Sequence, residues 1–178
     1  MGGCSVGENA TKIVAYELHS AELQQAVDIY AATWGKKRAD CELFFTRYAA
    51  HPGFRGRVAV TGERAVGMGF GHRAFAGNWW YDRVLEQMGE RNGDERLQDA
   101  WILVELAVLP EQRRHGVGSL LLDALLESTG CRRALLSTEA SNAGARGMYE
   151  NHGWTHLHHN LYFAGVDVPF VVMGKELG

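Results

Sequence analysis

The apolar run from Trp101 to Leu109 constrains the fold of this chain more than any other segment. Glu105 is its single ionisable side chain, and Pro110 follows the run directly. Apolar residues at successive positions, rather than at every second one, are typical of a strand covered on both faces of its sheet. We therefore expect an internal strand with helices packed on the sheet, which is an α/β (α+β) architecture.

The remaining segments alternate between strand and helix patterns. Strands are predicted at 12–18, 57–61, 65–72, 101–109, 134–138, 156–163 and 170–174, with a hairpin turn at 62–63. A first helix is predicted after an N-cap at Ser20, with Leu23, Ala26, Val27, Tyr30 and Trp34 on its apolar face, and a second after a cap at Asp40. A third is predicted at 117–128, with Leu120, Leu121, Ala124 and Leu125 pointing inward. A fourth is predicted at 143–152 and is closed by Gly153. This order predicts a mixed sheet covered by helices.

The length and charge exclude several classes of protein. A chain of 178 residues corresponds to one domain, which we expect to span residues 1–178 with an insertion at 75–99. The net charge of −3 argues against a nucleic-acid binder, which needs an excess of Lys and Arg. No apolar run approaches the ~20 residues that span a bilayer, and the N-terminal residues lack the pattern of a secretory signal. The cysteines Cys4, Cys41 and Cys131 lie far apart, so we expect reduced thiols in a cytoplasmic protein without a metal site.

A basic turn with two glycines follows the apolar strand. Arg113, Arg114, Gly116 and Gly118 stand between this strand and the next predicted helix. Glycines leave backbone N–H groups free to approach a ligand, and a helix N-terminus adds about half a positive charge. The turn lacks the Gly-Lys-Ser/Thr of a Walker loop, and Leu121 stands where a Rossmann fingerprint has its third glycine. A diphosphate-binding turn is therefore one interpretation, and an ordinary strand-to-helix turn is the other.

The segment from Ala100 to Trp154 resembles the GNAT superfamily of N-acetyltransferases. The family signature Arg/Gln-x-x-Gly-x-Gly/Ala is similar to residues 113–118, after the apolar triplet 106–108. A second family motif resembles Asn142 followed by Tyr149-Glu150-Asn151-His152-Gly153-Trp154, with Trp154 in place of Phe. The ending 173–177 is similar to the Met-x-Lys-x-Leu close of many members.

The resemblance implies a fold and a cosubstrate. The fold would be a mixed, largely antiparallel sheet of about seven strands, whose splayed central strands form an acetyl-CoA cleft. Backbone groups of three strand residues would bind the pantetheine arm, the basic loop would bind the pyrophosphate, and an asparagine would contact the cofactor arm. These cofactor-binding candidates are Leu106, Ala107, Val108, Arg113, Arg114, His115, Gly116, Val117, Gly118, Ser119 and Asn142.

Two side chains are candidates for catalysis. An alkylamine with a pKa near ~10.4 is almost entirely protonated at pH 7, and only the neutral amine can attack a thioester. Forming the neutral amine at this pH costs roughly 4–5 kcal/mol. Glu105 is the candidate general base, since burial raises the pKa of a carboxyl; a structural carboxylate is the alternative. The resemblance implies that Tyr149 protonates the leaving thiolate, and packing on the cofactor is the alternative. His72 and His152 are reserve acid–base groups.

The insertion at 75–99 is the candidate substrate element. Its segment from Asp82 to Asp99 has six acids and three arginines, which accounts for the whole net charge of −3. An acidic and aromatic wall of Trp79, Trp80, Asp82 and Glu86 (with Glu90 one turn further) would attract a cationic amine, whereas a solvated surface with the tryptophans as core anchors is the alternative.

The resemblance implies that the protein is an acyltransferase. We expect an acetyl-CoA-dependent N-acetyltransferase in which a primary amine attacks directly within a ternary complex. A non-catalytic acyl-CoA-binding or regulatory domain is the alternative, and a longer acyl group than acetyl is left open. The expected partner is a small-molecule or peptide amine, with no nucleic acid and no membrane; a homodimer is left open.

Overall fold

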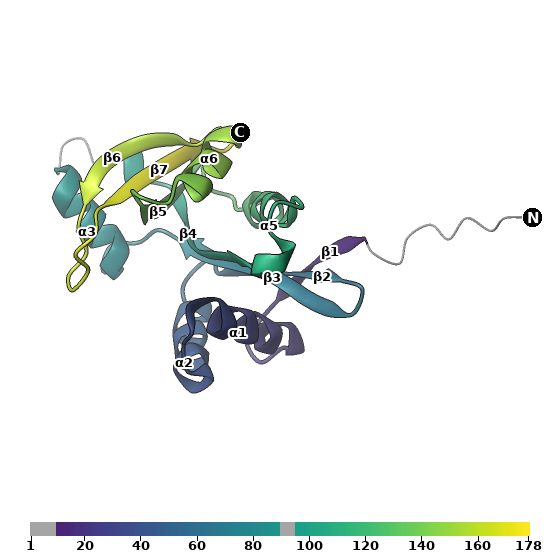
Figure 1. Cartoon of the computed structure of the whole chain (residues 1–178). Helices are drawn as coiled ribbons and strands as arrows, with labels where there is room; N and C mark the ends of the chain where they lie inside the picture. Colours follow the sequence, from purple (N-terminus) through teal and green to yellow (C-terminus); the bar gives the residue numbers. More distant parts are fainter. Residues whose placement is uncertain (1–9, 90–94) are drawn as a thin grey trace, which may run out of the picture. The chain divides into compact units, whose positions relative to one another are not determined.

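A seven-stranded sheet with the order β1-β2-β3-β4-β5-β7-β6 organises the protein in the computed structural model, which describes residues 10–89 and 95–178 (Figure 1). The strands are β1 (Thr11–Tyr16), β2 (Arg55–Thr61), β3 (Arg64–Arg73), β4 (Ala100–Val108), β5 (Arg133–Glu139), β6 (Thr155–Leu161) and β7 (Phe170–Glu176). The helices are α1 (Ala21–Trp34), α2 (Arg38–Ala49), α3 (Trp79–Met88), α5 (Val117–Leu126) and α6 (Ala143–Asn151), with a 3-10 turn at Pro110–Gln112. The predicted mixed sheet flanked by helices is confirmed.

The chain divides into two compact units. The first contains the chain up to Gly71 and Val104–Glu127, and the second contains His72–Leu103 and Ser128–Gly178. Strand β4 therefore begins in the second unit and ends in the first. One domain over residues 1–178, with an insertion at 75–99, stays a prediction.

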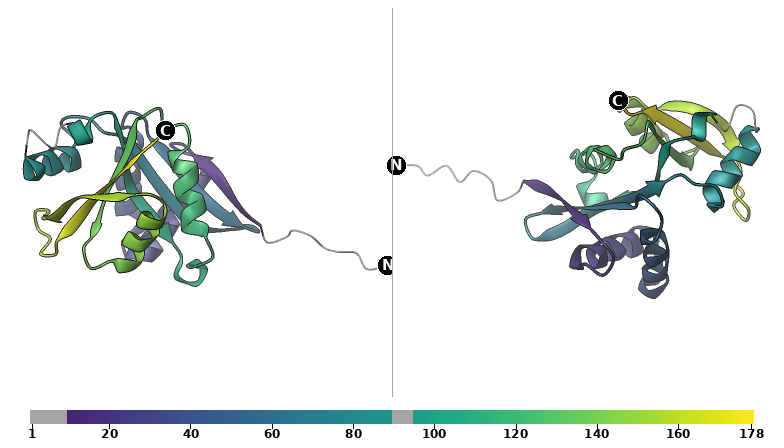
Figure 2. Two further views of the ribbon diagram at one scale, coloured as in Figure 1. Left: turned by 90° about the horizontal axis from the view of Figure 1, so that it is seen from above. Right: turned by 180° about the vertical axis from the view of Figure 1, so that it is seen from behind.

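In the first unit, helices cover both faces of a β-meander. Strands β1, β2 and β3 pair antiparallel, and Gly62, with φ of 61°, makes the predicted hairpin turn. Helices α1 and α2 lie on one face of these strands and α5 lies on the other (Figures 1 and 2). The Oγ atom of Ser20 accepts a hydrogen bond from the Leu23 N–H at 3.1 Å, which confirms the predicted N-cap of α1.

Three details of the predicted helices are wrong. Leu120 was expected to point inward but is 45% exposed, because a helix buries only one side and α5 buries Leu121, Leu122 and Leu125. Trp34 ends α1 and is 53% exposed. Asp40 does not cap α2, because the helix begins at Arg38. Asp40 lies in the first turn of α2, where the helix dipole stabilises a negative charge.

In the second unit, β5 joins a parallel and an antiparallel neighbour. Its parallel register with β4 comprises Ala100 with Arg133, Trp101 with Ala134 and Ile102 with Leu135. On its other side β5 pairs antiparallel with β7, and β7 pairs antiparallel with β6. Gly153 follows α6 with φ of 79°, as expected for the residue that ends this helix.

Helix α3 is tied to the end of β6. The Gln87 side chain bonds both backbone groups of Tyr162: Oε1 accepts from the N–H at 3.1 Å, and Nε2 donates to the carbonyl at 2.8 Å. Asn78 caps the helix by accepting from the Tyr81 N–H at 3.1 Å. The predicted helix within 75–99 is thus confirmed, and hydrogen bonds hold it against the end of β6 in the second unit.

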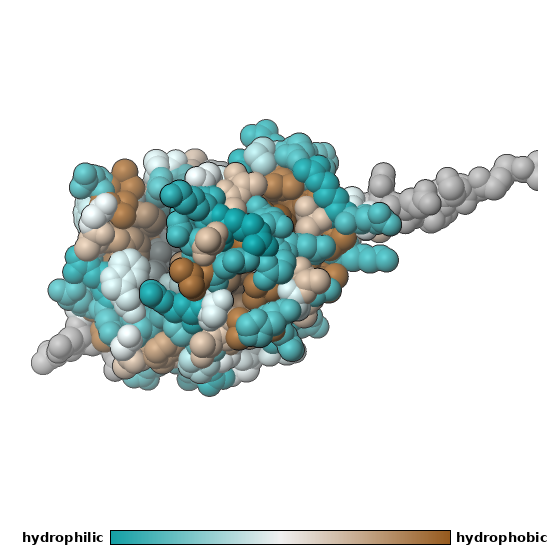
Figure 3. Space-filling model, turned by 90° about the horizontal axis from the view of Figure 1, so that it is seen from below, coloured by the Kyte–Doolittle hydropathy of each residue, from teal (hydrophilic) through white to brown (hydrophobic). Residues whose placement is uncertain are grey.

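Two observations concern the membrane-spanning potential of the chain and one face of its surface. Within residues 10–89 and 95–178, no helix is both long enough and apolar enough to pass through a bilayer. On the face drawn in Figure 3, hydrophobic residues are interspersed with hydrophilic ones.

Candidate functional site

Glu105 is the centre of a polar network in the first unit. It is partly buried on β4, where the other residues of the strand are apolar. The Tyr30 hydroxyl, from α1, donates to Glu105 Oε1 at 3.4 Å. The Lys36 ammonium in turn donates to the Tyr30 oxygen at 3.1 Å. A carboxylate, a phenol and an ammonium thus form one connected chain.

The surroundings of Glu105 move its titration toward neutral pH. Burial raises the pKa of Glu105 from 4.5 to about 7, while the positive charge of Lys36 and the hydrogen bond from Tyr30 lower it. Burial and the nearby Glu105 carboxylate raise the pKa of the Tyr30 phenol. The phenol therefore stays protonated and acts as a hydrogen-bond donor. A carboxyl that titrates near 7 can accept and release protons at neutral pH.

Aromatic rings surround the Tyr30 side chain. Phe44 stacks on the Tyr30 ring with centroids 5.3 Å apart, and Phe45 meets it edge-on at 5.5 Å. Tyr48 contacts Phe44 at 4.8 Å, and burial and the Glu105 charge both raise its pKa. These rings come from α2, so the environment of Glu105 depends on how α1 and α2 pack together.

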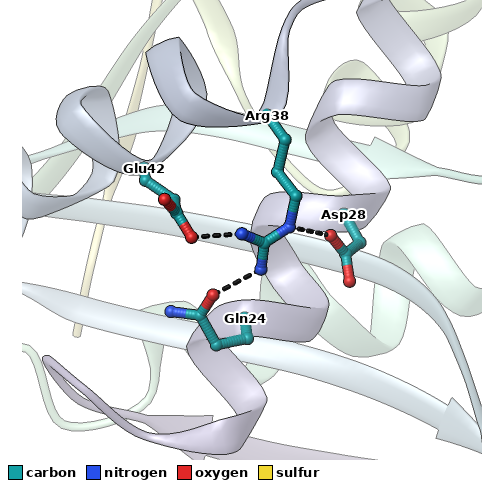
Figure 4. Close-up of polar contacts among 4 residues, drawn as sticks. All are labelled: Gln24, Asp28, Arg38 and Glu42. Carbon is teal, nitrogen blue, oxygen red and sulfur yellow. Dashed lines mark hydrogen bonds and ion pairs between the residues drawn. The ribbon is translucent and has the colours of Figure 1, made fainter.

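Arg38 joins the two helices on their outer side (Figure 4). From the first turn of α2, its guanidinium donates to Asp28 Oδ1 at 2.7 Å and to Gln24 Oε1, both on α1, and to Glu42 Oε1 on α2. Exposed ion pairs contribute little stability singly, but here one planar group bonds three partners on two helices. The contact links α1 to α2 on their exposed side.

The basic loop of the first unit offers donors for an anion. Gly116 precedes α5 with φ of 81°, and a Cβ placed there would meet open space. Among residues 10–89 and 95–178, no side chain caps the first N–H groups of α5, and these groups point out of the helix end without an intrahelical acceptor. Arg113 donates to the Val108 carbonyl at 3.0 Å, which holds the loop against the end of β4. Arg114 and His115 are exposed.

The loop and the end of β4 carry most of the predicted cofactor-binding residues. The open glycine, the uncapped helix end and the two arginines fit the diphosphate of acetyl-CoA. Leu106, Ala107 and Val108 follow the residues of β4 that are in register with β5. Val117, Gly118 and Ser119 form the first turn of α5. Their binding role stays a prediction.

Two predicted site residues lie on α6 in the second unit. Tyr149 is buried and its ring lies 5.7 Å from that of Trp154. Asn142 is exposed and caps the helix, its Oδ1 accepting from the Ala145 N–H at 3.1 Å. The asparagine thus has a structural role of its own, and its predicted contact with the cofactor arm stays a prediction.

Residues of the predicted acidic and aromatic wall have partners within the second unit. Asp82 accepts from the Gly77 N–H at 3.1 Å, and Glu86 pairs with Arg83 at 2.7 Å. Trp80 donates through Nε1 to Ser137 at 2.8 Å. Trp79 packs on Phe163 and is 59% exposed, and Glu90 lies outside the described residues.

The histidines do not gather into a ligand set. In the described part of the chain, no group of three or more His, Cys, Asp or Glu side chains could hold a metal ion. His156 bonds Glu150 at 2.8 Å and stacks on His159. The reserve groups have backbone partners: His72 Nδ1 lies 2.8 Å from the Arg73 carbonyl, and His152 Nδ1 lies 2.8 Å from the Met148 carbonyl.

Local sequence patterns do not identify Tyr30 and Lys36 as site residues. Tyr30 was counted only as an apolar residue of the first helix. A signal was present, because a tyrosine at a buried helical position needs a partner for its hydroxyl. The partner lies 75 residues away and could not be named from local sequence.

Comparisons with known proteins identify the family of the chain. The sequence profile of the Acetyltransferase (GNAT) family matches residues 23–154. No curated protein sequence matches the chain.

Solved acetyltransferase structures share the fold. An aminoglycoside 6'-N-acetyltransferase from Enterococcus faecium superposes with a TM-score of 0.68 at 17% identity, over 93% of this chain and 96% of that one. The ribosomal-protein-S18-alanine N-acetyltransferase from Escherichia coli gives 0.65 at 16% identity, over 94% and 95%. An aminoglycoside 6'-N-acetyltransferase complexed with coenzyme A gives 0.65 at 16% identity, over 93% and 96%.

The raised pKa of Glu105 makes stability depend on pH. Below 4.5, the ordinary pKa, the folded and unfolded states both carry the proton; between 4.5 and about 7 only the folded state keeps it. The free energy of unfolding of the wild type should therefore fall relative to that of Glu105→Gln as pH rises through this window. Above the window the difference between the two proteins should stay constant. Urea unfolding of both proteins at about pH 5 and about pH 8 measures this difference. Equal differences at the two pH values would contradict the raised pKa.

Proposed function

Because the chain belongs to the GNAT acetyltransferase family, we propose that it moves an acetyl group from acetyl-CoA to a primary amine by direct attack in a ternary complex. The protein is an acyltransferase, and acetyl-CoA is its cosubstrate. The observation that carries the mechanistic part of the proposal is the carboxyl of Glu105 in an apolar strand, with a pKa of about 7.

Glu105 is the proposed general base. The carboxylate takes a proton from the ammonium of the substrate, directly or through a water molecule, so that the amine can attack. A base that titrates near the working pH is available in its charged form and still has affinity for the proton. Side-chain burial in the aromatic surroundings of Tyr30 supplies this condition.

The first unit also supplies the proposed acetyl-CoA site. When bound, acetyl-CoA supplies the thioester carbonyl that the amine attacks. The N–H groups at the start of α5, together with Arg113 and Arg114, would hold the diphosphate. The backbone of Leu106 to Val108 would bind the pantetheine arm as an added strand.

Tyr149 is the proposed general acid. A phenol is protonated at neutral pH and can donate its proton to the departing thiolate. Tyr149 is buried beside Trp154, which restricts the motion of its ring. Asn142, which precedes Tyr149 by about two helix turns, would contact the cofactor arm.

The acceptor is proposed to be a cationic amine on a small molecule or a peptide. The similar structures include both kinds of enzyme by name, acting on an aminoglycoside and on a protein alanine. The acids and tryptophans of α3, Asp82, Glu86, Trp79 and Trp80, are the proposed attractive surface. The buried free thiols of Cys41 and Cys131 support a cytoplasmic site of action.

Thiol release tests the proposed activity. Acetyl-CoA is incubated with a panel of an aminoglycoside, a polyamine, a free amino acid and a peptide with a free N-terminus. We expect CoA thiol to appear only with a suitable amine, and Glu105→Gln to lower kcat/KM by roughly 100-fold or more. Glu63→Gln, in the exposed turn between β2 and β3, is the control that should leave the rate unchanged. Thiol release independent of amine, or full activity of Glu105→Gln, would contradict the proposal.

The role of Tyr149 has a separate kinetic signature. Tyr149→Phe keeps the ring but removes the proton donor, so kcat should fall by about tenfold or more with little change in the KM for acetyl-CoA. Tyr162→Phe, at an exposed tyrosine, is the matched control. A kcat within about twofold of wild type would remove Tyr149 from the mechanism.

The proposed substrate surface predicts a KM effect. Replacing Asp82 by Asn and Glu86 by Gln removes two negative charges but keeps an oxygen that can accept the Gly77 N–H bond. The KM for the amine should rise several-fold while acetyl-CoA kinetics stay the same. Steady-state kinetics at low salt measure both constants, and an unchanged amine KM would show that these acids only form solvated surface.

A further inference from the structure

The Tyr30 hydroxyl is bonded on both sides within the first unit. It donates to Glu105 Oε1 at 3.4 Å and accepts from Lys36 Nζ at 3.1 Å. Lys36 follows the glycine that ends α1, and its Nζ also lies 5.1 Å from the centre of the Tyr30 ring. An exposed cation therefore reaches the base through a buried phenol.

Packing, and not the hydrogen bonds, sets the position of the Tyr30 ring. The residue is 3% exposed, and Phe44 and Phe45 contact the ring from two directions. On the exposed side of the same helix pair, Arg38 of α2 also bonds Asp28 and Gln24 of α1. A phenylalanine ring would make the same packing contacts. The packing therefore does not require the Tyr30 hydroxyl, which bonds the Glu105 carboxylate.

We infer that Tyr30 and Lys36 are positioning residues for Glu105: Lys36 polarises the Tyr30 phenol, and the phenol orients the Glu105 carboxylate and favours its charged form. This inference rests on the proposed role of Glu105 as the base. A hydrogen bond from a cation strengthens the donor it binds, and a polarised donor stabilises a carboxylate more than a neutral one does.

The two partners oppose the effect of burial. Burial alone would raise the pKa of Glu105 further, and both the Lys36 charge and the Tyr30 hydrogen bond lower it. Without them the carboxyl would hold its proton to higher pH, so a smaller fraction of it could accept a proton from an amine at neutral pH.

Titratable groups meet Glu105 from several elements of the first unit. They are Tyr16 of β1, Tyr30 of α1, Lys36 of the α1–α2 connection and Tyr48 of α2. Burial raises the pKa of all three tyrosines, so they stay neutral over the range in which Glu105 titrates. Arg57 on β2 faces Tyr16. Lys36 is accordingly the charged partner whose removal should move the titration of Glu105.

A direct titration tests the inference without turnover. Protein labelled with ¹³C at the glutamate carboxyl is titrated by NMR, and the Glu105 signal is assigned by its loss in Glu105→Gln. Tyr30→Phe and Lys36→Met should each raise the pKa of Glu105 by roughly 0.5–1 unit, and the double variant should shift it by less than the sum. Lys37→Met, at the neighbouring exposed lysine, is the matched control and should cause no shift.

The pH dependence of turnover links the titration to function. In Tyr30→Phe and Lys36→Met, the acidic limb of kcat/KM should move to higher pH by the same amount, and raising the pH should restore the rate. An unchanged Glu105 pKa in either variant would overturn the inference, even if Tyr30→Phe lowers the thermal stability. Lys36 is exposed, so its replacement keeps the test valid if the tyrosine variant folds poorly.

The titration and the thiol assay fail independently. If Glu105→Gln keeps full activity, Glu105 is not the general base, but the titration still measures the effect of Tyr30 and Lys36 on the pKa of Glu105. If the base role holds and the titration does not move, Tyr30 and Lys36 have only a structural role.

Discussion

The burial of one carboxylate in an apolar strand is the constraint on which the first unit depends. Glu105 on β4 cannot be charged in such surroundings without compensation, and the compensation comes from Tyr30 and Lys36. Their position depends on the packing of α1 and α2, whose rings enclose Tyr30 and whose outer faces Arg38 joins. The chemistry proposed for the strand is therefore a property of the helix pair.

The proposed acetyl-CoA site has a different origin, because it is built from a continuous segment. The strand end, the turn at Gly116 and the start of α5 follow one another directly in sequence. Backbone N–H groups and a helix end bind a diphosphate without needing a distant partner. For this reason a short sequence motif predicts this segment, whereas the match to the family over residues 23–154 leaves the acceptor undefined.

Sequence patterns predicted what depends on neighbouring residues. The Ser20 cap, the Gly62 turn, the end of α6 at Gly153 and the internal strand with Glu105 are local features, and the structure contains them. The inward direction of Leu120 was wrong, since three successive leucines cannot all face one side of α5. The bond from Tyr30 to Glu105 arises from tertiary packing between residues 75 positions apart, which periodicity does not encode. The partners of Asp82 and Glu86 are local: Gly77 lies five residues before Asp82, and Arg83 lies three residues before Glu86.

The most direct test of this account is the pH profile of kcat/KM for an amine substrate in the wild type and in Glu105→Gln. If Glu105 is the base, the wild-type profile has an acidic limb with an apparent pKa near 7, which reports the free Glu105 carboxyl, and the variant loses that limb. If the same limb persists in Glu105→Gln, another group is the base, and the network around Tyr30 serves only the fold.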